Sequence, residues 1–195
     1  MRCRSIFRQY PPMMPHMQCR SLFLCALLSL PIVAFSGEAT VAMVDFDLVD
    51  TSLQGEMMPS SSKPDTKRLE RTEKQIRGQI NNSKYFKVIG DETTARINEQ
   101  LRQNQVYLHE CNGCEMRVGK AVDSEYVLVG WVQKVSNLIL NLNLVLRKVP
   151  TDEDIVGASV DMRGNTNEAW SRAAMYLLEH NFFPQYAKLQ KKSAS

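Results

Sequence analysis

The feature that most constrains the fold is a strict two-residue alternation between positions 138 and 147. Leucine occupies every second position, and two of the intervening residues are asparagine. The leucines are Leu138, Leu140, Leu142, Leu144 and Leu146. Successive side chains of a β-strand point to opposite faces, so this period buries one face and leaves the other largely polar. The run therefore predicts a strand in a sheet that is not covered completely on both sides.

The segments around this strand predict the rest of the sheet. A β-rich run at 125–135 comes before it, and a turn at 150–154 leads to a last strand at 155–162, which together form an antiparallel meander. Another β-rich run lies near the start, at 39–48, and a short one at 85–89. The chain is therefore expected to build one sheet from both its early and its late strands.

Helices are predicted between and after these strands. Their expected positions are 65–81, a helix opening at Asp91, a short helix from Cys114, and a final helix for which Asn165 and Glu168 form a capping box. The order β-α-β-α-α-β-β-β-α predicts an α/β fold: a mixed sheet with an antiparallel C-terminal meander and flanking helices.

The first 36 residues are typical of an export signal. Four arginines precede an apolar run at 22–35, and no acidic residue occurs among them. The run is shorter than the roughly 20 residues that span a bilayer. We expect a cleaved signal peptide at 1–36, no stable membrane anchor, and a single periplasmic domain at 37–195. Within that domain, residues 50–64 are expected to form a mobile loop and residues 188–195 a frayed tail.

The charge balance of the exported part excludes one class of partner. Four of the 24 basic residues and none of the 21 acidic ones precede residue 37, which leaves 20 against 21, a net charge of −1. Without a basic stripe, the domain lacks the electrostatic features of a nucleic-acid binder. We expect no nucleic-acid partner.

Two of the five cysteines lie outside the signal, in a C-x-x-C motif formed by Cys111 and Cys114. In an oxidising compartment the default for such a pair is a structural disulfide. A redox role is the alternative, because a thiol at a helix start has a lowered pKa. His109 adds a third potential ligand for a soft metal, but no fourth ligand is nearby, and Glu115 stands where a c-type haem motif needs histidine.

A candidate interaction surface follows from the meander. It consists of Trp131, Gln133, Asn137, Asn141 and Asn143. A tryptophan flanked by amide side chains suits protein contact. The alternative is a core tryptophan beside an ordinary solvated face. No nucleophile has an evident histidine partner, and no phosphate-binding glycine motif occurs, so neither a catalytic residue nor a cofactor is expected.

Three acidic residues, Asp45, Asp47 and Asp50, follow the first strand. Paired carboxylates can bind a cation or transfer a proton. The segment lacks the glycine and the final glutamate of a calcium loop, so capping and turn roles are favoured.

Segments 127–141 and 159–172 resemble an exported bacterial family known only as a domain of unknown function, with similarity over residues 41 to about 178. More loosely, the order of elements is similar to the amino-terminal domain of the TolB envelope protein and its relatives. The resemblance implies a non-catalytic periplasmic accessory or assembly protein that binds another envelope protein, in a setting associated with quinoprotein dehydrogenases. The alternative is a redox or metal-handling protein that uses His109, Cys111 and Cys114.

Overall fold

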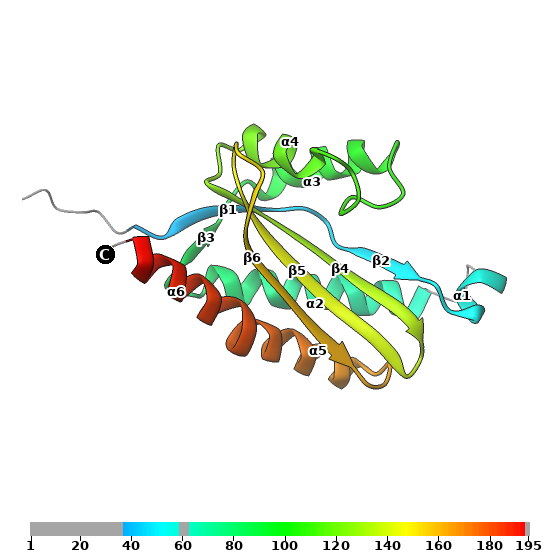
Figure 1. Cartoon of the computed structure of the whole chain (residues 1–195). Coiled ribbons are helices and arrows are strands. Elements are labelled where there is room, and N and C mark those ends of the chain that lie inside the picture. Colours follow the sequence, from blue (N-terminus) through cyan, green and yellow to red (C-terminus); the bar gives the residue numbers. More distant parts are fainter. Residues whose placement is uncertain (1–36, 59–62, 194–195) are drawn as a thin grey trace, which may run out of the picture. The chain divides into compact units, whose positions relative to one another are not determined.

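The computed structural model describes residues 37–58 and 63–193, and the predicted signal peptide at 1–36 lies outside them (Figure 1). The strands are β1 (Ala39–Met43), β2 (Asp47–Asp50), β3 (Phe86–Val88), β4 (Tyr126–Ser136), β5 (Ile139–Lys148) and β6 (Glu153–Met162). The helices are α1 (Leu53–Met57), α2 (Lys63–Asn81), α3 (Asp91–Arg102), α4 (Cys114–Ala121), α5 (Asn167–Tyr176), the π-helical segment η2 (Leu177–Phe182) and α6 (Phe183–Ser193).

The strands form one mixed sheet in the order β3-β1-β4-β5-β6. The β1 strand pairs in parallel with both β3 and β4, whereas β4, β5 and β6 pair antiparallel. The β2 strand lies off this path and pairs in parallel with the later part of β4. The α/β class and the antiparallel C-terminal meander are confirmed.

Helices cover the two faces of the sheet unequally. One face packs against α2, α5, η2 and α6 in a core that includes the leucines of β5 and the indole of Trp170. On the other face, α3 and α4 pack over β1 and the first part of β4 in a smaller core that includes Val127 and Val129. Figure 1 shows α3 and α4 on one side of the sheet and α5 and α6 on the other.

The leucine alternation is confirmed for four of its five members. Leu140, Leu142, Leu144 and Leu146 are each at most 1% exposed. Leu138 is 73% exposed, because the chain turns between β4 and β5 at this point and the strand begins one residue later, at Ile139. A turn residue has no opposing strand or helix to pack against.

The first predicted strand, 39–48, is interrupted, and side chains explain the break. The Phe46 N–H donates to Glu73, and Arg102 donates to the carbonyls of Asp45 and Phe46. These backbone groups are therefore used by side chains instead of a neighbouring strand. The Phe46 ring also lies over Gly130, where an added Cβ would approach it to 2.4 Å.

Three other boundaries differ from the sequence expectation. The final helix is capped by Thr166, whose hydroxyl accepts from the Ala169 N–H at 3.2 Å, because the Asn165 side chain is taken up by other partners. The predicted loop 50–64 contains the end of β2 and the short helix α1, which Ser52 caps. The predicted frayed tail is helical as far as Ser193.

Candidate functional site

Part of the sheet face beside α3 and α4 has no helix over it. Along β4, Val127 and Val129 are buried under these helices, whereas Trp131 and Gln133, which follow on the same face, are partly or fully exposed. Their cross-strand partners are Asn143 and Asn141, and the next strand contributes Ser159 and Asp161. We call this surface the open face: Trp131, Gln133, Asn141, Asn143, Ser159 and Asp161.

Hydrogen bonds order only part of the open face. Asn141 Nδ2 donates to Asp161 Oδ1 at 2.7 Å, and Ser159 Oγ donates to Asn141 Oδ1 at 3.1 Å. In the part of the chain that the structure describes, the side-chain amides of Gln133 and Asn143 have no hydrogen-bond partner. These two amides can donate and accept without breaking an internal bond.

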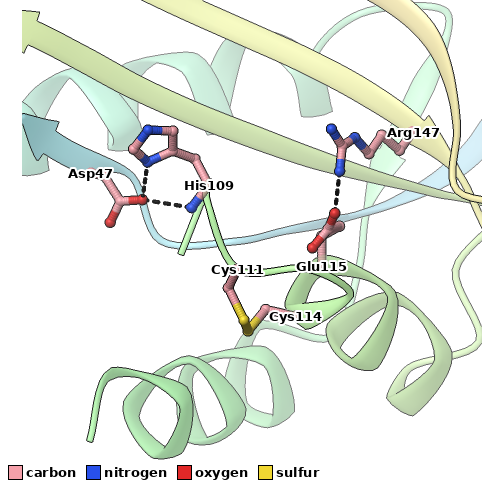
Figure 2. Close-up of a disulfide and its surroundings, with 6 residues drawn as sticks. All are labelled: Asp47, His109, Cys111, Cys114, Glu115 and Arg147. Carbon is pink, nitrogen blue, oxygen red and sulfur yellow. Dashed lines mark hydrogen bonds and ion pairs between the residues drawn. A yellow bond between two sulfur atoms is a disulfide. The ribbon is translucent and has the colours of Figure 1, made fainter. Parts of the chain in front are cut away.

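Trp131 borders the covered part of the sheet and is held there by a histidine. The His109 ring stacks on the indole with centroids 4.8 Å apart and an interplanar angle of 13°. His109 is fixed in turn by Asp47, which accepts from its backbone N–H at 2.8 Å and lies 2.7 Å from its Nδ1 (Figure 2). Asp47, only 1% exposed, also accepts from Arg102. A buried carboxylate thus fixes the segment that limits the open face.

The expectation of capping and turn roles for the three acidic residues missed this arrangement. Asp47 lies on a strand and ties β2 to the segment before α4, 62 residues away in sequence. The available signal was the placement of Asp47 in an apolar context, where a carboxylate is stable only with partners.

The two cysteines come together at the start of α4. Their Cα atoms are 5.5 Å apart, which is within the range of disulfide-bonded residues, with Cys114 buried and Cys111 partly exposed. Figure 2 shows the His109 ring turned toward Asp47 and away from the sulfur atoms. Among the described residues, no group of three or more His, Cys, Asp or Glu side chains is arranged to hold a metal. His109, Cys111 and Cys114, the ligand set of the metal-handling alternative, are accordingly not among the groups arranged in this way.

Next to Cys114, Glu115 is 2% exposed and pairs with Arg147 of β5 (Figure 2). Arg147 also donates to Asp154 at 2.7 Å. These contacts fix α4 to the meander.

A second polar cluster lies where β4 ends, on the core side of the sheet. Lys134 is 2% exposed, and its Nζ lies 3.0 Å from Asp50 and 2.8 Å from Asp65. Burial opposes the charged form of Lys134, but the hydrogen bonds that its ammonium donates to the two carboxylates outweigh this effect and raise its pKa above the ordinary value. Burial likewise opposes ionisation of Asp50, yet hydrogen bonds from Ser52 and Lys134 hold its pKa below the usual range.

Asn137 belongs to this cluster and not to the open face. In the turn between β4 and β5, it donates to Gln54 Oε1 at 3.3 Å and accepts from Asn165 Nδ2 at 3.2 Å. Asn165 also donates to Asp65 and accepts from the indole N–H of Trp170. Four of the five predicted surface residues therefore lie together, and the fifth is part of a structural network.

Exposed apolar side chains adjoin this end of the sheet. They belong to α1 and to the β4–β5 turn with the strand ends beside it, which the Asn137–Gln54 hydrogen bond joins to α1. We call them the apolar tip: Leu53 (72% exposed), Met57 (74%), Val135 (50%), Leu138 (73%) and Ile139 (60%). Sequence reasoning missed this group because Leu138 was assigned to the core.

The fold and these sites define a small α/β protein with a half-covered mixed sheet. The chain belongs to the DUF3280 family, described as "Protein of unknown function (DUF2380)", which matches residues 39–182. The predicted membership of a family of unknown function is confirmed. No curated protein matches the chain.

Several solved structures match the chain at low identity. The C-terminal domain of LpoB from Salmonella enterica is 15% identical, with a TM-score of 0.43, and the match covers 67% of this chain and 87% of that chain. Lipoprotein GNA1162 from Neisseria meningitidis is 15% identical, with a TM-score of 0.39, over 66% and 83%. The PelC dodecamer from Paraburkholderia phytofirmans is 12% identical, with a TM-score of 0.41, over 73% and 86%. At such identities, no residue's role is carried from these proteins to this chain.

In residues 37–58 and 63–193, no helix is both long and apolar enough to cross a membrane.

Proposed function

We propose that the protein is a non-catalytic accessory protein of the bacterial envelope that binds another envelope protein through its open face. The observation that carries this proposal is the unequal covering of the sheet. One face is packed against helices along its length, whereas no helix packs over the other face from Trp131 onward.

The composition of the open face fits protein recognition. A half-buried aromatic ring supplies contact area, and the amides of Gln133 and Asn143 supply hydrogen-bonding groups without internal partners. The apolar tip extends this surface with side chains that are at least half exposed. Contiguous exposed apolar groups beside polar ones are typical of protein contacts.

The proposed location rests on the predicted signal at residues 1–36. Fractionation of the producing bacterium should recover the protein from the periplasm, with a mature N-terminus between residues 37 and 40. An intact N-terminus in the cytosolic fraction would exclude this location. A setting near a quinoprotein dehydrogenase stays a prediction, which identification of the partner would test.

Photo-crosslinking in intact cells tests the binding function. A photoreactive amino acid is placed at Gln133 or Asn143, and, as a control, at Glu179, which is exposed on η2 at the other side of the sheet. We expect one discrete adduct, the same from both open-face positions, and none from Glu179. Equal adducts from all three positions, or none from the open face, would contradict the proposal.

A matched pair of substitutions separates binding from folding. Gln133→Arg adds a charged, bulky side chain to the open face, whereas Glu179→Arg places the same side chain on the helical side, where it replaces a carboxylate. Both positions are exposed, so thermal unfolding should stay within a few degrees of the parent protein. Only Gln133→Arg should abolish the adduct formed from position 143.

The redox alternative is favoured by one observation, the partly exposed Cys111 in the turn before α4. The redox alternative predicts that the cysteine pair exchanges with model disulfides, an activity that the accessory function does not require. Its test is given with the predictions on the cysteine pair.

A further inference from the structure

The groove between α2 and α5 contains a second polar site, on the sheet side opposite the open face. It holds a cavity of about 220 Å³, and its lining residues from α2 include Arg68, Arg71, Thr72 and Gln75. From α5, Asn167 and Ser171 lie across the groove. The proposed partner surface uses none of these residues.

Two arginines line this cavity, and only one of them has a charge that no neighbouring carboxylate neutralises. Arg68 forms an ion pair with the buried carboxylate of Asp65, so its charge is neutralised locally. Arg71 has no carboxylate partner among the described residues: its Nε donates to the Lys67 carbonyl, and its Nη2 donates to Asn167 Oδ1 at 2.9 Å. The remaining guanidinium N–H groups of Arg71 are available to a ligand.

A hydroxyl that can reach the same cavity has no partner within the protein. Thr72 is 3% exposed and lines the cavity, and its side chain forms no hydrogen bond within the part of the chain that the structure describes. A hydroxyl on a largely buried residue is most stable when it is hydrogen-bonded, so this one is available to a group that enters the cavity. Ser171 lines the other wall, and its carbonyl accepts from Gln75 Nε2 at 3.3 Å.

From this geometry we infer that the α2–α5 cavity binds a carboxylate group. Arg71 supplies the positive charge, and the Thr72 and Ser171 hydroxyls donate to the carboxylate oxygens. A single unpaired cation balances a monoanion, and a guanidinium fork matches the planar shape of a carboxylate. A phosphate dianion would leave one negative charge uncompensated.

The inference is tested by titrating the exported protein with propionate and following the backbone amide signals of Thr72 and Ser171 by NMR. We expect saturable shifts at these two residues. Arg71→Gln should abolish saturation, and Thr72→Val should weaken binding about tenfold through loss of one hydrogen bond to a charged group. Arg117→Gln, at an exposed arginine on α4, is the control and should leave binding unchanged.

A further ligand identifies the source of the carboxylate. A short acetylated peptide with one aspartate that binds at least tenfold more tightly than propionate would assign the site to an acidic protein segment, whereas equal affinity would assign it to a small free acid. Absence of saturable shifts, equal binding by Arg71→Gln, or tighter binding of inorganic phosphate would overturn the inference. Because Arg71 is remote from the open face, Arg71→Gln should leave cross-linking at Gln133 intact, so failure here does not decide the proposed function.

Discussion

The ammonium of Lys134 lies 2.8 Å from a carboxylate oxygen of Asp65, and both side chains are at least 96% buried. Asp65 lies in the first turn of α2 and Lys134 lies near the end of β4, so the pair fixes the start of the helix to the end of the strand. Asp50 completes the cluster from β2.

Lys134→Met should be strongly destabilising. It removes the shared cation and leaves Asp50 and Asp65 buried without it, a change that typically costs about 3 to 5 kcal/mol. Chemical denaturation should show this loss. Arg77→Met breaks an ion pair with the exposed Asp91 and should cost less than about 1 kcal/mol. Similar losses for both variants would mean that the Lys134 cluster behaves like a surface ion pair.

The cluster also predicts a pH dependence with a definite sign. The pKa of Asp50 is lowered in the folded state, so its contribution to stability is present above its unfolded pKa and is lost as pH falls through the lower, folded value. Asp50→Asn should therefore be less stable than the parent protein at neutral pH, and the difference should shrink below about pH 4. Thermal unfolding across this range measures it, and a difference that grows on acidification would contradict the assignment.

The pKa of Lys134 is raised, so its contribution has the opposite pH dependence. It is fully present below the unfolded pKa of lysine, about 10.4, and is lost as pH rises through the higher, folded value. Stability of the parent protein should accordingly fall at strongly alkaline pH, and Lys134→Met should lose less stability there.

The register of β5 can be tested with two adjacent aspartate substitutions. Leu142 is fully buried, so Leu142→Asp places a carboxylate in the core and should cost more than about 3 kcal/mol. Asn143→Asp lies on the open face and should cost less than about 0.5 kcal/mol. Asn141 is a poorer control because its amide donates to Asp161, and an aspartate there would face a like charge. Equal losses at 142 and 143 would mean that the face is covered in solution.

The sequence was sufficient to predict the meander because side-chain alternation alone assigns the two faces of β5. The same rule failed at Leu138. This leucine continues the alternating pattern of the strand in sequence, but it lies in the turn before the strand begins. It also could not predict the partners of Lys134. A lysine two residues after Val132 lies on the buried face, which indicates an ion pair, but the two carboxylates are 69 and 84 residues away and only the folded chain brings them close.

The capping error at Asn165 has a similar origin. Local sequence favours asparagine as a helix cap, whereas the tertiary structure uses its amide to join Asp65 and the Trp170 indole. Thr166 then takes the capping role. Long-range hydrogen bonds therefore decided a boundary that a local rule assigned one residue too early.

The cysteine pair should form an intramolecular disulfide that stabilises the exported protein. A loop of four residues restricts the unfolded chain only slightly, so replacing both residues by serine should cost about 2 kcal/mol and leave the domain folded. Mass spectrometry with and without reductant counts the free thiols.

The same pair tests the redox alternative. A structural bridge should have a reduction potential below about −300 mV, whereas a catalytic pair would be more oxidising and would accelerate exchange in a model substrate. Two free thiols with stoichiometric bound metal would instead favour metal handling through His109.

The stacking of His109 on Trp131 makes the protein its own optical probe. The chain has two tryptophans, and Trp170 is only 1% exposed, so any change in emission on adding a partner comes mainly from the indole at the border of the open face. His109 stands two residues before Cys111, and the same fluorescence should therefore register opening of the cysteine pair. Occupancy of the surface and the oxidation state of the neighbouring turn are thus readable from one intrinsic signal, without a label.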